Sequence, residues 1–278
     1  MASILLTGSH GYLGERLFQV LNAPNHRITR LSHKPAGDSI SYSDLTTTKT
    51  NFNVIIHAGT CYGRNGESEV QICEANVVLP NLLLDFAVQR SALFLNIDSV
   101  LRPDLNHYAA TKREFRNCLN ARIHENNYIN LILDHFYGPG DAGSKFPTWL
   151  TRKLLFTKEQ IPLSDGKQER NFIYIDDLVR TIVAMIDGTI DVRGLVRLQG
   201  PDTIRIRELA TLIAELTGQD LTRLEFGKLP QRSTGSEVAP LEEGTKMLSP
   251  PPPTLGLTAG LGELIAAERK AQTLTRPL

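Results

Sequence analysis

The sequence predicts an α/β protein in which a doubly wound parallel sheet is joined to a smaller mixed α/β lobe at the C-terminal side. Short apolar runs alternate with stretches of helical periodicity through the first half of the chain, as in parallel strands connected by helices. The 278 residues are 41% hydrophobic, which is enough for one large core or two smaller ones. We expect residues 1–137 and 171–198 to form the sheet domain, and residues 138–170 and 199–278 to form the second lobe.

The expected elements follow in chain order. Strands are predicted at residues 3–8, 26–32, 53–59, 92–99 and 129–138, and helices at residues 11–22, 76–90 and 107–125. In the second half, residues 171–186 predict a strand that runs into a helix with Asp176 or Asp177 as its N-cap. Residues 205–218 predict a helix closed by Gly218. Residues 138–149 are expected to form a loop, and the proline run at residues 248–256 a rigid surface strap.

Composition excludes several classes of protein. Thirty basic residues balance thirty acidic ones, and no Lys/Arg cluster occurs, so we expect no nucleic-acid partner. Three cysteines at unrelated spacings predict reduced thiols in a cytoplasmic protein. The seven histidines fall at no metal-ligand spacing, so no metal is expected. The N-terminal apolar run is too short for a signal peptide, and we expect no segment that crosses a membrane.

A glycine-rich turn follows the first predicted strand. Gly8, Gly11 and Gly14 lie at three-residue spacing between that strand and the first helix. Glycine allows a tight turn and a close approach of the backbone to a diphosphate, which the helix N-terminus then stabilises. The strand and helix on either side favour a Rossmann-type dinucleotide site over a merely structural turn.

The end of the second strand bears on the choice of dinucleotide. An acidic residue there would bind the ribose 2′-hydroxyl of NAD and repel a 2′-phosphate. This chain has Ser32, His33 and Lys34 instead, a hydroxyl followed by cationic groups that suit a phosphate. We favour NADP, with NAD still possible, since His33 and Lys34 could also be solvated side chains.

A catalytic arrangement is predicted around residues 96–112. Ser99 ends a strand, and Tyr108 and Lys112 are four residues apart on the next helix, so they share a face. Hydride transfer to a ketone makes an alkoxide that needs a proton. Tyr108 is the expected acid/base, Lys112 the ammonium that lowers its pKa, and Ser99 the hydroxyl that orients the carbonyl. A Tyr/Lys pair also occurs on ordinary solvent-facing helices, but the glycine turn and Ser99 favour catalysis.

Five motifs together resemble a known family: TGSHGYLG (residues 7–14), HAG (57–59), YAATK (108–112), FYGPG (136–140) and RNFIYIDD (170–177). The chain resembles the extended branch of the short-chain dehydrogenase/reductase superfamily, the NAD-dependent epimerase/dehydratase family. The short connection at residues 100–107 is similar to that of CDP-abequose and CDP-paratose synthase-type nucleotide-sugar 4-ketoreductases. In most members of the family the hydroxyl residue lies much further before the tyrosine.

The resemblance implies a set of dinucleotide contacts. Asp44 would bind the adenine amine and Leu45 its face, while residues 57–59 would lie along the diphosphate and ribose. For His57, a satisfied strand-end histidine is an equal alternative. The implied cofactor-binding residues are Gly8, His10, Gly11, Tyr12, Leu13, Ser32, His33, Lys34, Asp44, Leu45, His57, Ala58, Gly59, Tyr108, Lys112 and, near the nicotinamide, His135.

The resemblance also implies a nucleotide-sugar substrate. Arg170 and Arg232 match positions that contact the substrate diphosphate, and Lys145 and Phe146 could line the sugar or base pocket. Each could instead be an ordinary surface cation or a packing phenylalanine. Asn171 stands where the family usually has Asp.

The implied reaction is NADPH-dependent reduction of the 4-keto group of a nucleotide-linked 4-keto-6-deoxy sugar. Val100 and Leu101 follow Ser99 where the 4,6-dehydratases carry Asp and Glu, so dehydration is not expected. An NAD-dependent nucleotide-sugar epimerase and a non-catalytic NAD(P)-binding sensor remain alternatives. The resemblance further implies a cytoplasmic homodimer.

Overall fold

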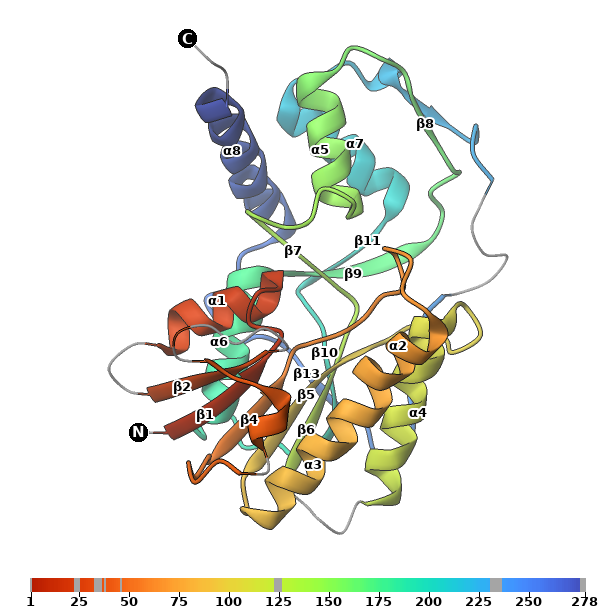
Figure 1. Cartoon of the computed structure of the whole chain (residues 1–278). Coiled ribbons are helices and arrows are strands. Elements are labelled where there is room, and N and C mark those ends of the chain that lie inside the picture. Colours follow the sequence, from red (N-terminus) through yellow and green to blue (C-terminus); the bar gives the residue numbers. More distant parts are fainter. Residues whose placement is uncertain are drawn as a thin grey trace. The chain divides into compact units, whose positions relative to one another are not determined.

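The computed structural model describes residues 2–22, 26–32, 37, 39–45, 47–122, 127–230 and 237–275 (Figure 1). Three predicted site residues, His33, Lys34 and Arg232, lie outside the described residues. The chain forms two compact units. Unit 1 comprises Met1–Leu133, Val179–Leu198 and Glu237–Leu248, and unit 2 comprises Asp134–Leu178, Gln199–Ser236 and Ser249–Leu278.

The unit boundaries differ from the predicted ones in three segments, since residues 134–137 and 171–178 belong to unit 2 rather than to the sheet domain. Glu237–Leu248 belongs to unit 1, whereas the sequence assigned it to the second lobe. Its last residues form a strand that pairs in parallel with Gly194–Leu198 at the edge of the large sheet. Three residues carry too short a pattern to reveal such a pairing from sequence.

Unit 1 is built on one eight-stranded sheet. Its strands are β1 (Ala2–Thr7), β2 (His26–Leu31), β3 (Ser39–Ile40), β4 (Val54–His57), β5 (Leu93–Ser99), β6 (Tyr128–Leu133), β10 (Gly194–Leu198) and β13 (Lys246–Leu248). They lie in the order β13-β10-β6-β5-β4-β1-β2-β3, and every ladder is parallel. The predicted α/β class is therefore confirmed. The strand order reverses between β1 and β4, where doubly wound sheets bind ligands at the carboxyl ends of the strands.

Helices cover both faces of this sheet. They are α1 (Tyr12–Leu21), α2 (Glu69–Cys73), the π-helical turn η2 (Glu74–Val78), α3 (Leu79–Gln89), α4 (His107–Ala121) and α6 (Ile175–Ile186), with a short 3-10 helix η1 (Tyr42–Leu45). Figure 1 shows α1 and α6 on one face and α2, α3 and α4 on the other. The core between sheet and helices includes Leu5, Ile55, Phe94, Phe115 and Leu119, each at most 1% exposed.

The rod formed by α2, η2 and α3 begins earlier than the sequence predicted. The prediction started at residue 76, but the helix begins at Glu69 because Ser68 and Gln71 form a reciprocal capping box. In the described part of the chain, this rod is also the one helix that is long and apolar enough to cross a membrane, by length and composition alone. Buried residues make up 44% of its most apolar window, and core helices of soluble proteins pass the same test.

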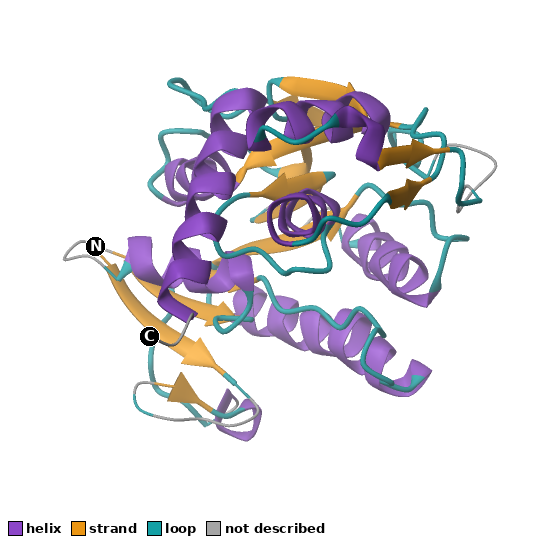
Figure 2. Cartoon of the chain, turned by 90° about the horizontal axis from the view of Figure 1, so that it is seen from above, coloured by secondary structure: helices purple, strands orange, loops and turns teal. Residues whose placement is uncertain are grey.

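Unit 2 mixes small sheets with helices, as expected for the second lobe (Figure 2). Strands β7 (His135–Tyr137), β9 (Glu169–Tyr174) and β11 (Asp202–Arg205) form one sheet, and β8 (Ile161–Leu163) pairs with β12 (Leu224–Phe226). Its helices are α5 (Phe146–Phe156), α7 (Ile206–Thr217), η4 (Leu221–Arg223) and α8 (Leu257–Thr275). Gly218 ends α7 in the left-handed conformation, as predicted.

Three local predictions in this part of the chain were wrong. The strand expected at residues 129–138 breaks at Asp134, so that β6 and β7 belong to different sheets. Asp176 and Asp177 lie in the first turn of α6 rather than at its N-cap. The expected loop at residues 138–149 already contains the start of α5, whose Pro147 suits the first turn of a helix.

Candidate active site

The glycine-rich turn connects β1 to α1. Gly8 adopts a left-handed conformation with φ of 68°, and a Cβ atom built on it would lie 2.4 Å from the backbone nitrogen of Gly59. A Cβ on Gly14 would lie 2.0 Å from the carbonyl oxygen of Gly8. Gly11 is the N-cap of α1 and donates its N–H to Gly8 at 2.9 Å. Close backbone packing therefore requires glycine at positions 8 and 14.

This geometry fits a dinucleotide. The turn lies at the carboxyl end of β1 beside the end of β4, since Thr7 pairs with His57 across the two strands. That is the reversal point of the sheet, and the first turn of α1 supplies a helix N-terminus of the kind that binds phosphate. Among the other predicted contacts in the turn, His10 is exposed, Tyr12 is half-buried and Leu13 is buried.

The predicted adenine-side residues are arranged as follows. Ser32 follows β2, and its N–H donates to Ile40 at 3.1 Å. Asp44 is exposed in η1, where the hydrogen bonds of Ser41 lower the pKa of its carboxyl group and keep it ionised. Leu45 is 5% exposed and packs in the hydrophobic core.

His57 is almost fully buried at the end of β4. Its Nδ1 lies 2.8 Å from Oγ1 of Thr7, which also accepts the N–H of Gly59 at 3.2 Å. Burial, with a smaller effect of the Lys112 ammonium, lowers the pKa of His57 to about 3, so that the ring is neutral. Its Nε2 has no hydrogen-bond partner in the described structure. Through Thr7, the ring ties residues 57–59 to β1. The Nδ1 atom thus has the hydrogen-bond partner that is expected of a satisfied strand-end histidine.

Ser99 and Tyr108 meet at the carboxyl end of β5. The Tyr108 phenol lies close to the side chain of Ser99, and this polar neighbour lowers the pKa of the phenol. Burial is the largest influence and raises that pKa above its usual value, and Tyr62 and Asp98 raise it further. Asn106 caps α4 by accepting the N–H of Ala109 at 2.9 Å, which fixes the first turn of the helix that carries Tyr108.

Lys112 lies one turn further along α4 and is 3% exposed. Its Nζ donates to the carbonyl oxygen of Ile97 at 2.9 Å; in the described structure this backbone group, not the phenol, is its hydrogen-bond partner. Burial lowers the pKa of Lys112 to about 8, with Asp98 acting in the opposite direction. The side chain is thus held in place beside the strand end.

A buried polar network lies behind these residues, and the sequence analysis did not identify it. Asp98 accepts hydrogen bonds from Asn130 at 2.6 Å, from the Ser99 N–H at 2.7 Å and from Arg116 at 2.7 Å. Arg116 also donates to the carbonyl oxygen of Ser99 at 2.6 Å and to Glu242 at 2.7 Å. Both backbone polar groups of Ser99 are therefore fixed by buried charged side chains. The available sequence signal for this network was the alternation of polar residues along β5, together with the arginine on α4.

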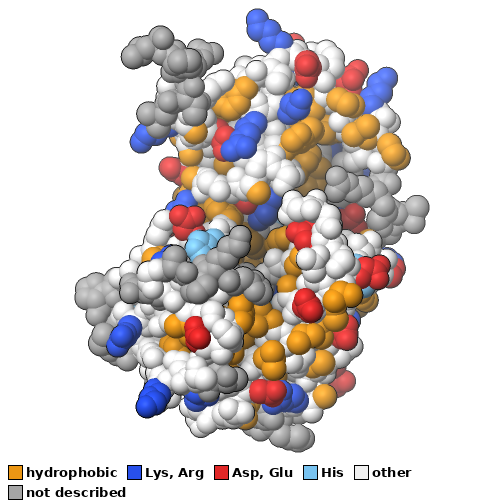
Figure 3. All heavy atoms as spheres, viewed as in Figure 1, with side chains coloured by type: hydrophobic (Ala, Val, Ile, Leu, Met, Phe, Trp, Pro, Cys, Tyr) orange, Lys and Arg blue, Asp and Glu red, His pale blue; other side chains and the backbone are white. Residues whose placement is uncertain are grey.

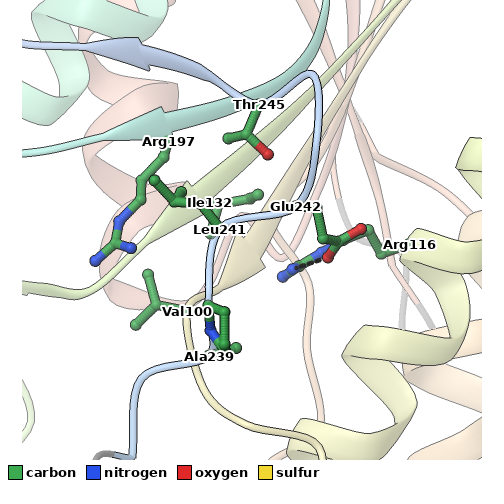
Figure 4. Close-up of a pocket in the computed structure, with 9 residues that line it drawn as sticks. Val100, Arg116, Ile132, Arg197, Ala239, Leu241, Glu242 and Thr245 are labelled. Carbon is green, nitrogen blue, oxygen red and sulfur yellow. Dashed lines mark hydrogen bonds and ion pairs between the residues drawn. The ribbon is translucent and has the colours of Figure 1, made fainter.

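The segment Glu237–Leu248 braces the Ser99 loop from outside. Ala239 donates its N–H to Val100 at 2.7 Å, and Arg102 donates to Glu237 at 2.8 Å. Figure 4 shows Glu242 of this segment paired with Arg116 next to a cavity of about 10 Å³, room for roughly one water molecule. This cavity is a packing gap behind the site, far too small for a substrate.

The remaining predicted site residues belong to unit 2. Nδ1 of His135 lies 2.5 Å from Oδ1 of Asp134, and the imidazole is 42% exposed. Arg170 on β9 is 6% exposed and donates to the carbonyl oxygen of Glu169 at 2.8 Å. Asn171, the departure from the family pattern, donates to Gly200, Asp202 and Thr203 and ties β9 to the start of β11.

Lys145 and Phe146 form the start of α5. Lys145 is the N-cap residue, with Nζ 3.2 Å from the buried carboxylate of Asp141 and 3.9 Å from the Phe136 ring centre. The Phe146 ring lies 6.0 Å from that of Trp149. Lys145 is thus partly neutralised within its own unit.

Comparisons with known proteins agree with this architecture. The pattern of the NAD dependent epimerase/dehydratase family matches residues 4–193. CDP-abequose synthase of Salmonella typhimurium is 26% identical over 220 residues, which are 70% of this chain and 74% of that protein. Among solved structures, UDP-glucose 4-epimerase of Thermotoga maritima has a TM-score of 0.76 at 16% identity, covering 97% of this chain and 99% of that one. MoeE5 in complex with UDP-glucose and NAD has a TM-score of 0.72 at 19% identity, with the same coverage.

The sheet, the glycine turn and the Ser99–Tyr108–Lys112 group define an NAD(P)-dependent oxidoreductase of the extended short-chain dehydrogenase/reductase type. The chain belongs to the NAD dependent epimerase/dehydratase family. The resemblance inferred from its motifs is confirmed.

Proposed function

We propose that the protein reduces the 4-keto group of a nucleotide-linked 4-keto-6-deoxy sugar with NADPH. The observation that carries the proposal is the proximity of the Tyr108 phenol to the Ser99 side chain at the end of β5, where Ser99 is followed by two residues that cannot move a proton. Val100 is 4% exposed and packs with Ile132 and Leu195. This apolar continuation disfavours elimination of water, and the CDP-abequose synthase relative supports a reductase of a nucleotide sugar.

The residues of this chain have separate tasks in that reaction. The glycine turn and the residue 57–59 segment hold the dinucleotide, which supplies a hydride to carbon 4 when bound. Ser99 donates a hydrogen bond to the carbonyl oxygen, and Tyr108 gives that oxygen its proton, so that the ketone becomes an alcohol. Buried Lys112 holds the nicotinamide ribose and keeps positive charge near the reacting oxygen.

The substrate contacts and the preference for NADP are parts of the same proposal. Arg170 binds the substrate diphosphate, with Arg232, Lys145, Phe146 and His135 as further contacts. Ser32, His33 and Lys34 favour the 2′-phosphate of NADP, although MoeE5 was solved with NAD. We place the protein in the cytoplasm, as a soluble biosynthetic enzyme like its relatives.

The proposal includes a homodimer formed through the α2–α3 rod and α4, so that each copy contributes two helices. The evidence for an exposed apolar face lies on the rod. Four of its side chains are exposed although apolar: Val70, Val78, Leu82 and Val88 are 40–66% exposed. Hydrophobic side chains lie at the surface over α3 (Figure 3). A face of this kind suits packing against a second copy as a four-helix bundle.

Turnover tests the proposed function. Purified protein is mixed with NADPH, or NADH in parallel, and with 4-keto-6-deoxy sugars on CDP, dTDP, GDP and UDP. Rapid oxidation of NADPH with one of them identifies the base and the cofactor. If no substrate is reduced and the purified protein carries tightly bound NAD, the reductase proposal is wrong and the epimerase alternative takes its place.

A further inference from the structure

The loop of residues 60–66, between β4 and α2, lies beside the candidate active site within unit 1. Gly63 and Gly66 adopt φ values of 67° and 84°, so that the chain turns sharply at both positions. Tyr62 lies between β4 and the first of these turns, and Arg64 lies between the two glycines. Neither residue was singled out by the sequence motifs.

Asn76 fixes the base of this loop to the helix that carries Tyr108. Its side chain is 1% exposed, accepts from the N–H of Cys61 at 2.9 Å and from Thr60 at 3.0 Å, and donates to the Cys61 carbonyl at 2.8 Å. It also donates at 3.1 Å to Thr111, whose hydroxyl in turn donates to the carbonyl oxygen of Tyr108 at 2.9 Å. One buried amide in a π-helical turn therefore holds the loop and the Tyr108 turn together.

The rings of Tyr62 and Tyr108 are in contact. Their centres lie 4.8 Å apart with an angle of 40° between the planes. The Arg64 guanidinium lies over the Tyr62 ring, 5.0 Å from its centre. Together, these two distances set an upper limit on the separation between the guanidinium and the Tyr108 ring. The positive charge of Arg64 lowers the pKa of the Tyr108 phenol.

In the part of the chain that the structure describes, no carboxylate is paired with Arg64. Within the described residues its guanidinium forms no ion pair, and the residue is exposed. By contrast, the nearby Arg113 and Arg116 are both paired with Glu242. An arginine without a carboxylate partner, held next to an acid/base tyrosine by an aromatic ring, is suited to an anion brought in by the substrate.

We propose that Arg64 binds the phosphate nearest the sugar and that the Tyr62 ring forms a wall of the sugar pocket. This inference rests on the proposed function. In a nucleotide-linked hexose, carbon 4 and the phosphate on carbon 1 lie on opposite sides of one pyranose ring. A sugar whose carbonyl oxygen meets Tyr108 would therefore place that phosphate one ring's width away, within the upper limit that the Tyr62 contacts set on the distance from Tyr108 to the Arg64 guanidinium.

Steady-state kinetics with dead-end inhibitors test the inference. The nucleoside diphosphate and monophosphate of the best substrate are compared as competitive inhibitors, since only the diphosphate carries the phosphate assigned to Arg64. We expect Arg64→Gln to raise KM for the nucleotide sugar about 10- to 100-fold, the effect of one lost charge-assisted hydrogen bond. KM for NADPH and kcat should change little, and the preference for the diphosphate should fall. Arg64→Lys should recover part of it, and Tyr62→Ala should also raise KM for the sugar.

Arg90→Gln is the matched control. Arg90 ends α3, and its guanidinium lies 3.6 Å from the Phe86 ring centre, so this variant removes the same charge and the same kind of ring contact elsewhere. An unchanged diphosphate preference in Arg64→Gln overturns the inference, as does a loss of kcat and thermal stability with that preference intact. A wild-type protein that turns over no nucleotide sugar contradicts the proposed function and this inference with it.

Discussion

The Arg116 guanidinium donates a 2.6 Å hydrogen bond to the carbonyl oxygen of Ser99. Ser99 is the hydroxyl that we expect to orient the substrate carbonyl, and the same guanidinium is paired with Asp98 and Glu242. Arg116 is 4% exposed, so its charge is held away from water by these partners. The position of Ser99 thus depends on a buried ion network.

Breaking that network should weaken both the fold and the activity. Arg116→Met leaves Asp98 buried without its partner, and we expect a loss of about 3–5 kcal/mol in the free energy of unfolding. Urea denaturation measures it. Glu242→Gln should destabilise the fold less, because Glu242 is the more exposed partner of Arg116 in this network. This variant should lower kcat while KM for NADPH stays constant. Glu243→Gln, at an exposed neighbouring position, is the control, and an equal effect of both variants would contradict the role of Glu242.

Removing the phenol hydroxyl should separate catalysis from binding. Tyr108→Phe deletes the proposed proton donor beside Ser99, so kcat should fall by about 10²–10⁴. NADPH affinity, followed by its fluorescence, should stay the same because the ring remains in place. A variant with full activity would show that another group supplies the proton.

The pH dependence should report Lys112. Burial raises the pKa of Tyr108 but lowers that of Lys112 to about 8, so Lys112 loses its proton first as the pH rises. We expect kcat to fall above about pH 8, and we expect this fall in the pH profile to move to higher pH in the Lys112→Arg variant. Since the folded protein releases this proton before the unfolded chain does, the contribution of Lys112 to the free energy of unfolding should rise between pH 8 and 10.5. If the fall in kcat stays at the same pH in Lys112→Arg, another group is responsible for it.

Two glycines of the turn provide a matched pair. A Cβ at position 14 would lie 2.0 Å from the Gly8 oxygen, whereas a Cβ at position 11 would lie 3.3 Å from it. Gly14→Ala should therefore cost at least about 1–3 kcal/mol of stability and abolish dinucleotide binding. Gly11→Ala should keep the fold, as measured by urea midpoints. Equal loss of stability in both variants would argue against this packing.

The proposed dimer predicts a position-dependent effect of charge. Leu82 on α3 is 55% exposed and Leu221 in unit 2 is 45% exposed. Leu82→Glu should convert a dimer to a monomer in light scattering, while Leu221→Glu should leave it intact. A wild-type protein that is monomeric at every concentration would rule out this interface.

The fold and the positions of Ser99, Tyr108 and Lys112 on β5 and α4 were predictable because their signals are local. The strand–glycine–helix pattern around Gly8 and the spacing of Tyr108 and Lys112 each depend on a few neighbouring residues. The pairing of Tyr108 with Ser99 follows from the short connection between β5 and α4. These features are encoded within one turn or one element.

The missed features depend on contacts between distant segments. Arg116 and Glu242 are 126 residues apart, and no local pattern links them. Asn76 joins Cys61 to Thr111 across three elements, and its role becomes visible only when the π-helical turn is in place. The Lys112 ammonium was expected to act on Tyr108 and to hold the nicotinamide ribose, and its hydrogen bond to the carbonyl oxygen of Ile97 was not foreseen.

The most direct test of the proposed reduction follows the hydride itself. NADPH deuterated on either face of nicotinamide carbon 4 is incubated with the protein and the nucleotide-linked 4-keto-6-deoxy sugar that it consumes, and the product is analysed by NMR. The account predicts deuterium at carbon 4 of the sugar from one of the two cofactors, in an amount equal to the NADPH oxidised. A product whose carbon 4 carries no deuterium from either cofactor, or a ketone that is left unreduced with NADPH unconsumed, would contradict it.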